Sequence, residues 1–217
     1  MEFKIENTEV YGLSKSIIAS GNAMRTEMDY NMSKVFEGKE IMTDGEWEDY
    51  YSKQYKRACN LGTTAVGAGH DNFLNGVIVQ FDLYAPLFMW KQLQRYHFLD
   101  FISSQSTMHR LIRFNIKEQC VEDTDKIILE RYQELLNDYN DNEGMTISAD
   151  EDKKKWRTLV ASLPCGFVLG ATMTTNYRQL KTIYNQRKHH KLKEWHDFCE
   201  WCESLPLFKE LCLQRGE

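Results

Sequence analysis

The sequence has no run of about 18 apolar residues, the length needed to cross a membrane. It has no excess of positive charge either, because 27 Lys and Arg stand against 32 Asp and Glu, a formal net charge of −5. Proteins that bind nucleic acids through their phosphates are usually basic. We therefore expect neither a membrane protein nor a partner of a nucleic-acid polymer. Two or three well-placed donors would still bind a single phosphate.

The first dozen residues lack the apolar core of a signal peptide. The six cysteines are spread along a chain of 217 residues, so we interpret them as reduced thiols, mostly buried. Both observations favour a cytoplasmic protein. The sequence also lacks an internal repeat, which leaves no indication of a solenoid or an array of small modules.

What the chain does contain indicates a folded globular protein. Its hydrophobic content is 42% and its aromatic content 12%, and its length suits a single domain, residues 1–217. The patterns favour more helix than strand, with three to five strands, and hence an α/β or α+β domain. We interpret the polar stretch Asn137–Lys155 as a surface loop within this domain rather than as a linker.

The stretch Gly69–Arg110 places an apolar scaffold beside many polar groups that could bind a ligand. Alternating apolar residues predict a strand over Asn75–Tyr84, and Pro86 ends it because proline has no N–H for a ladder bond. A buried helix is predicted over Leu87–Phe98. The hydroxyl-rich run after it, Ser103–Thr107, is expected to be a loop.

The first of two informative motifs lies in this stretch. Gly69-His70 precedes the strand, Ala85-Pro86 follows it, and the helix carries Gln92 three residues before Arg95-Tyr96-His97. These elements and their spacing resemble the flavin-dependent thymidylate synthases, in which the triplet reads Arg-His-Arg. The second Arg of the triplet and a Glu of the following loop are replaced here, because His97 stands last in the triplet and the loop offers serines.

A second motif resembles the same family, again without a gap. Leu163-Pro164 is followed by Asn176 and Arg178, which form an Asn-x-Arg pattern, and nine residues later by Arg187. Together the motifs identify a divergent member of the family. The resemblance implies a mixed or antiparallel sheet packed with helices and a homotetramer. It also implies reductive C5 methylation of a nucleotide like deoxyuridine monophosphate (dUMP). FAD is the implied cofactor, with NADPH and methylenetetrahydrofolate as co-substrates.

The resemblance also implies site residues, in two groups. The group expected to bind the nucleotide is Gln92, Arg95, Ser104, Ser106 and Arg187, of which Arg95 and Ser106 are expected to be catalytic. The group expected to bind the cofactor is His70, His97, Asn176 and Arg178. Arginine suits phosphate because its planar fork donates paired, charge-assisted hydrogen bonds, whereas His97 would bond phosphate or ribose more weakly and with pH dependence.

Two alternatives remain open. The altered triplet is also consistent with a catalytically degenerate protein that keeps the fold and binds a nucleotide without flavin chemistry. His196, Cys199 and Cys202 step by three residues, a spacing that could bind zinc with a fourth ligand. We favour packing for these three residues, and expect no metal, because such steps drift around a helix of 3.6 residues per turn.

Overall fold

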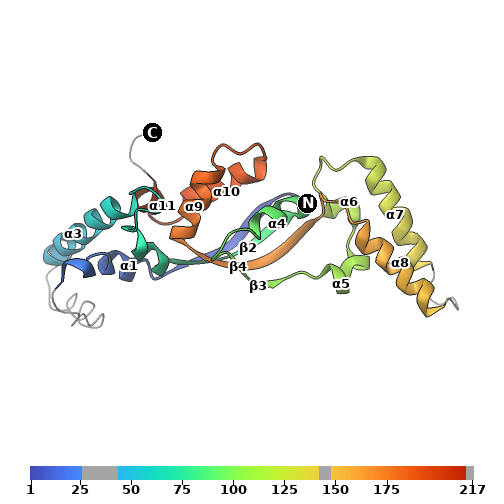
Figure 1. Cartoon of the computed structure of the whole chain (residues 1–217), viewed down its shortest axis with the longest axis horizontal. Coiled ribbons are helices and arrows are strands. Elements are labelled where there is room, and N and C mark those ends of the chain that lie inside the picture. Colours follow the sequence, from blue (N-terminus) through green and yellow to red (C-terminus); the bar gives the residue numbers. More distant parts are fainter. Residues whose placement is uncertain (26–43, 142–147, 214–217) are drawn as a thin grey trace. The chain divides into compact units, whose positions relative to one another are not determined.

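The computed structural model describes residues 1–25, 44–141 and 148–213 (Figure 1). The chain divides into two compact units, and each draws on segments that are distant in sequence. The first unit comprises Met1–Asn7, Phe81–Tyr96 and Phe101–Met173, and the second comprises Thr8–Gln80, His97–Asp100 and Thr174–Glu217.

The strands form a four-stranded antiparallel sheet in the order β1-β2-β4-β3. Their bounds are Lys4–Tyr11 for β1, Ile78–Pro86 for β2, Asp100–Ser104 for β3 and Val168–Asn176 for β4. The predicted class, an α/β protein with an antiparallel sheet and accompanying helices, is confirmed.

Strand β2 was predicted from its alternation. Val79, Phe81 and Leu83 are at most 1% exposed, while the residues between them are half-buried. The strand begins three residues later than predicted, because Asn72–Gly76 forms a 3-10 helix, η2. Strand β4 was not predicted, because it is buried at several positions on both faces and therefore alternates poorly.

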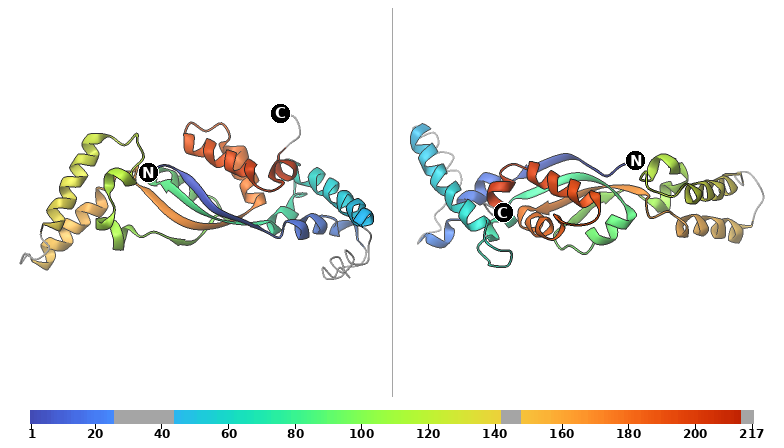
Figure 2. Two further views of the ribbon diagram at one scale, coloured as in Figure 1. Left: turned by 180° about the vertical axis from the view of Figure 1, so that it is seen from behind. Right: turned by 90° about the horizontal axis from the view of Figure 1, so that it is seen from above.

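The first unit contains five helices and one 3-10 helix among the described residues. They are α4 (Leu87–Leu93), α5 (Thr107–Arg110), η3 (Leu111–Arg113), α6 (Ile116–Gln119), α7 (Lys126–Asn140) and α8 (Ala149–Ala161). Helices α7 and α8 lie side by side (Figure 2). The buried hydroxyl of Tyr132 on α7 donates a hydrogen bond of 3.1 Å to the carbonyl of Leu159 on α8, which links the pair.

The prediction of a surface loop over Asn137–Lys155 is wrong for most of the described residues, because α7 continues to Asn140 and α8 begins at Ala149. Residues 142–147 lie outside the described part. The Ser148 hydroxyl caps α8 by accepting a hydrogen bond from the Glu151 N–H, and the first turn of α8 carries three acidic residues. Capping and the helix dipole therefore stabilise this helix. Its sequence has too few apolar residues for a helix to be predicted from their spacing.

The described helices of the second unit surround a separate aromatic core. They are α1 (Leu13–Ala19), η1 (Asn22–Met24), α3 (Asp44–Gly62), η2, α9 (Tyr177–Arg187), α10 (Lys193–Ser204) and α11 (Phe208–Cys212). The fully buried rings of Tyr177 and Phe208 meet edge to face at 5.3 Å. Gly62 lets α3 approach α11, because a Cβ there would lie 2.1 Å from the Leu211 carbonyl oxygen.

Among the helices of residues 1–25, 44–141 and 148–213, none has the length and apolar character needed to cross a membrane.

Candidate functional site

Gln92 lies in the last turn of α4 and Arg95 two residues after the helix ends, both in the first unit. Buried Met89, Trp90 and Leu93 anchor this short helix, and the Trp90 ring packs on Phe101 of β3 at a centroid distance of 5.1 Å. Gln92 is half-buried, and Arg95 is exposed in the turn that follows. No carboxylate in the described part of the chain pairs with Arg95, so its guanidinium can bind an anion.

The predicted helix Leu87–Phe98 is too long, because α4 ends at Leu93. The Gln94 and Tyr96 N–H groups close a tight turn onto the carbonyls of Trp90 and Leu93. Phe98 then adopts a left-handed backbone with a φ of 58°, which an α-helix cannot accommodate. This geometry exposes His97, which belongs to the second unit.

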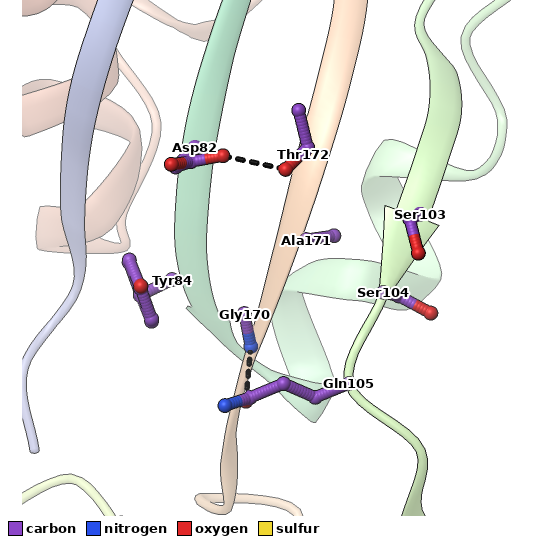
Figure 3. Close-up of a pocket in the computed structure, with 8 residues that line it drawn as sticks. All are labelled: Asp82, Tyr84, Ser103, Ser104, Gln105, Gly170, Ala171 and Thr172. Atoms are coloured by element: carbon purple, nitrogen blue, oxygen red, sulfur yellow. Dashed lines mark hydrogen bonds between the residues drawn. The ribbon is translucent and has the colours of Figure 1, made fainter.

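Ser103 and Ser104 belong to strand β3 rather than to the predicted loop. Both are exposed, and they line a hollow on the sheet of the first unit with a volume of about 330 Å³ (Figure 3). Gln105 fixes the end of β3. Its N–H donates to the Gly170 carbonyl at 2.9 Å, and its side-chain oxygen accepts from the Gly170 N–H at 2.8 Å. A Cβ at Gly170 would lie 2.7 Å from the Tyr84 ring, so a larger residue would force that ring to shift.

A carboxylate lies in the same hollow. Asp82 accepts hydrogen bonds from Asn7 Nδ2 at 2.8 Å and from the Thr172 hydroxyl at 2.6 Å (Figure 3). These two bonds, that from Asn7 first, lower the pKa of Asp82 below its ordinary value because they favour the charged form. The hollow that Ser103 and Ser104 line therefore also presents a fixed negative charge, on Asp82 of the second strand from β3.

Ser106 begins the short helix α5. It is half-buried, and its hydroxyl accepts a hydrogen bond of 3.3 Å from the His109 N–H. The hydroxyl proton remains available as a donor, because the cap uses only the oxygen as acceptor.

The second unit holds the other predicted residues. Arg178, in the first turn of α9, donates from Nε to Asp71 Oδ1 at 3.0 Å. Asp71 directly follows exposed His70 and is itself only 1% exposed. Its other oxygen accepts from Lys181 Nζ at 2.8 Å. The structure thus connects the segment of His70 to the helix of Arg178 through one buried carboxylate.

Asn176 is 8% exposed and forms the N-cap of α9, where its side-chain oxygen accepts from the Gln179 N–H at 2.9 Å. This bond satisfies one of the free donors at the helix start. Its amide NH₂ group has no hydrogen-bond partner in the described part of the chain, so it can still donate to a ligand.

Arg187 ends α9, and its guanidinium lies over the ring of Trp195 at 4.5 Å from the centroid. Trp195 is completely buried in α10, and the His190 ring meets it from the side at 6.2 Å. Burial first, and then the positive charges of Arg187 and His196, lower the pKa of His190.

Comparison with known proteins yields matches in structure only, because no family profile and no curated protein sequence matches the chain. A flavin-dependent thymidylate synthase ThyX from Helicobacter pylori, complexed with FAD and dUMP, gives a TM-score of 0.61 at 19% identity over 99% of this chain and 100% of that chain. A second H. pylori ThyX structure with FAD and dUMP gives 0.60 at 17% identity, over 98% of this chain and 97% of that one.

A UMP/dUMP methylase, PolB from Streptomyces cacaoi bound with 5-Br dUMP, gives a TM-score of 0.60 at 13% identity, over 97% of this chain and 94% of that chain. The chain has the ThyX fold. The fold that the two motifs implied is therefore confirmed.

Within the ThyX fold, sequence reasoning missed Asp71, Lys181 and Trp195 as partners of the predicted residues. The sequence offered a weak indication for Asp71, which stands next to His70 between a Gly-rich and an apolar segment. A charged residue that becomes buried there needs a partner of opposite charge. Lys181 and Trp195 gave no such indication, because only the tertiary packing places them against Asp71 and Arg187.

The zinc alternative finds no support in the described residues, where no three His, Cys, Asp or Glu side chains converge on one point. His196 Nε2 lies 2.5 Å from the His190 carbonyl oxygen. Cys199 and Cys202 are buried residues of α10. Burial raises the pKa of Cys199 to about 11, which disfavours the thiolate that zinc requires.

Proposed function

We propose that the protein is a FAD-dependent enzyme that methylates C5 of dUMP, or carries out a related C5 modification of a uridine nucleotide. The observation that carries this proposal is the likeness, over nearly the whole length of each chain, to two structures of H. pylori ThyX with FAD and dUMP and to a UMP/dUMP methylase. The site residues add support, because Asn176 and Arg178 keep N–H donors that no described residue uses, and no described carboxylate pairs with Arg95.

On the nucleotide side, Gln92, Arg95 and Arg187 would each contact the nucleotide. Arg95 is exposed and has no carboxylate partner among the described residues, and Arg187 is held over Trp195. Ser104 and Ser106 would line the nucleotide site with hydroxyl donors. Arg95 would also stabilise charge that develops on the substrate, and Ser106 would orient the pyrimidine, which are the catalytic roles we assign.

On the cofactor side, His70, His97, Asn176 and Arg178 would hold FAD. The side chains fit such a ligand, because the Asn176 amide and the terminal nitrogens of Arg178 keep N–H donors that no described residue uses. When bound, FAD supplies hydride for the reduction, with NADPH and methylenetetrahydrofolate as co-substrates. We further propose a single functional domain, residues 1–217, that assembles as a cytoplasmic homotetramer.

A second candidate is a nucleotide-binding protein without flavin chemistry. The observation that favours it is the triplet Arg95-Tyr96-His97, in which His97 stands where the family pattern has Arg. An absorption titration with FAD, with and without dUMP, distinguishes the candidates. A FAD-dependent enzyme would bind flavin, and the flavin spectrum would change when dUMP is added. A nucleotide-binding protein without flavin chemistry would bind dUMP but not FAD.

A further inference from the structure

Asp71 is a buried carboxylate of the second unit. It is 1% exposed, and each of its oxygens faces a different cation: Arg178 Nε at 3.0 Å and Lys181 Nζ at 2.8 Å. A buried carboxylate is stable only when it is paired and hydrogen-bonded. Asp71 therefore locks both cations in place.

The two cations have different surroundings. Lys181 is 2% exposed, and Nζ donates to the carbonyls of Gly62 and Thr64 at 2.7 and 2.6 Å as well as to Asp71. All three of its donors are thus used within the protein. Its role is to fasten the segment after α3 to helix α9.

Arg178 has free capacity instead. Only Nε is bonded to a described side chain, and the side chain is 34% exposed. The terminal nitrogens carry four N–H donors with no partner in the described part of the chain. A guanidinium held at Nε and open at its outer edge suits acceptor oxygens of an anionic ligand, and holding it in place reduces the conformational entropy lost at binding.

We propose that Asp71 is a positioning residue for FAD, which acts by orienting Arg178, while Lys181 serves the stability of the fold. This inference rests on the proposed function. It assigns separate roles to the two ion pairs of one carboxylate, so substitutions can separate cofactor binding from stability.

Three variants test this division. Lys181→Met leaves the Asp71–Arg178 pair intact but leaves Asp71 Oδ2 without its cation, so the melting temperature should fall by roughly 10 °C. The double variant Asp71→Leu with Lys181→Met removes both buried charges and should regain part of that loss, but it frees Arg178. Thr175→Val is the matched control, because it removes a part-buried hydrogen bond of 2.7 Å to the Phe98 carbonyl, in which neither Asp71 nor Arg178 takes part.

The dissociation constant of FAD, measured by absorption well below each melting temperature, gives the result. We expect values near wild type for Lys181→Met and Thr175→Val, and about 10- to 100-fold weaker binding for the double variant. Adding Arg178→Ala to the double variant should cause no further loss, because the two changes remove one interaction. FAD affinity that instead follows the melting temperature across the variants would overturn the inference.

A measurement without flavin separates this inference from the proposed function. The exchange rate of the Arg178 Nε–H, followed by ¹⁵N NMR, should be slow in the wild type and in Lys181→Met, and fast in the double variant. Fast exchange in the wild type would overturn the positioning role. Failure of the wild type to bind FAD, with slow exchange of Nε–H, would contradict the FAD assignment while the orientation of Arg178 stands.

Discussion

The guanidinium carbon of Arg187 lies 4.5 Å from the ring centroid of Trp195, a residue with no exposed surface. A cation over a buried indole is attracted by the ring face and cannot turn away without losing that contact. If Arg187 binds nucleotide phosphate, Trp195→Leu should weaken dUMP binding about 3- to 10-fold relative to Trp195→Phe, as measured by calorimetry. Equal affinities of the two variants would argue against a role for the ring. Trp201→Phe, in the same helix, serves as a control.

Arg95 is expected to contribute more directly, through charge-assisted hydrogen bonds to the phosphate. Arg95→Ala should weaken dUMP binding by about 2 kcal/mol, or roughly 30-fold. Lys91→Ala is the matched control, since Lys91 is an exposed cation on α4, four residues before Arg95. If both variants lose affinity equally, the effect is one of general charge, and Arg95 has no specific place in the site.

Asp82 makes stability depend on pH in a defined direction. Its folded pKa lies below the unfolded value, so its contribution is fully present above about pH 4 and is lost as the pH falls through the folded pKa. Thr172→Val removes one of the two hydrogen bonds and should cost about 0.5–1 kcal/mol in urea unfolding at pH 7, with a smaller difference near pH 3. A difference that does not change with pH would exclude the carboxylate as its source.

The cysteines should differ sharply in reactivity. Cys165 is exposed, and the other five are buried. Burial raises the pKa of Cys120 and Cys199 to about 11 and that of Cys202 and Cys212 well above the ordinary value. Iodoacetamide at pH 7.5 should therefore add one label to the native protein, at Cys165, by mass spectrometry. Rapid labelling of Cys199 or Cys202 would contradict the packing of α10.

The sequence predicted those elements whose pattern records a single buried face. Alternation located β2, whose start lies three residues after the predicted one. It missed β4, which is buried on both faces, and α8, whose stability comes from the Ser148 cap and its acidic first turn. The predicted helix also continued past Leu93, where α4 ends, because the residue pattern does not indicate the left-handed backbone of Phe98.

The site was predictable in its positions but not in its connections. Family spacing located Arg178 and Arg187, yet the buried partners that fix them, Asp71 and Trp195, depend on contacts between residues that are 107 and 8 positions apart. Only the fold brings such residues together. Ser104 was expected in a loop and lies instead on the edge strand β3, beside the hollow that contains Asp82.

The central claim is that this chain binds FAD and brings it next to a uridine nucleotide. The most direct test is an absorption titration of the purified protein with FAD, followed by the addition of dUMP. We predict saturable flavin binding, seen as a shift of the flavin bands, and a further spectral change when dUMP is added. A flavin spectrum that stays identical to that of free FAD, with and without dUMP, would contradict the account.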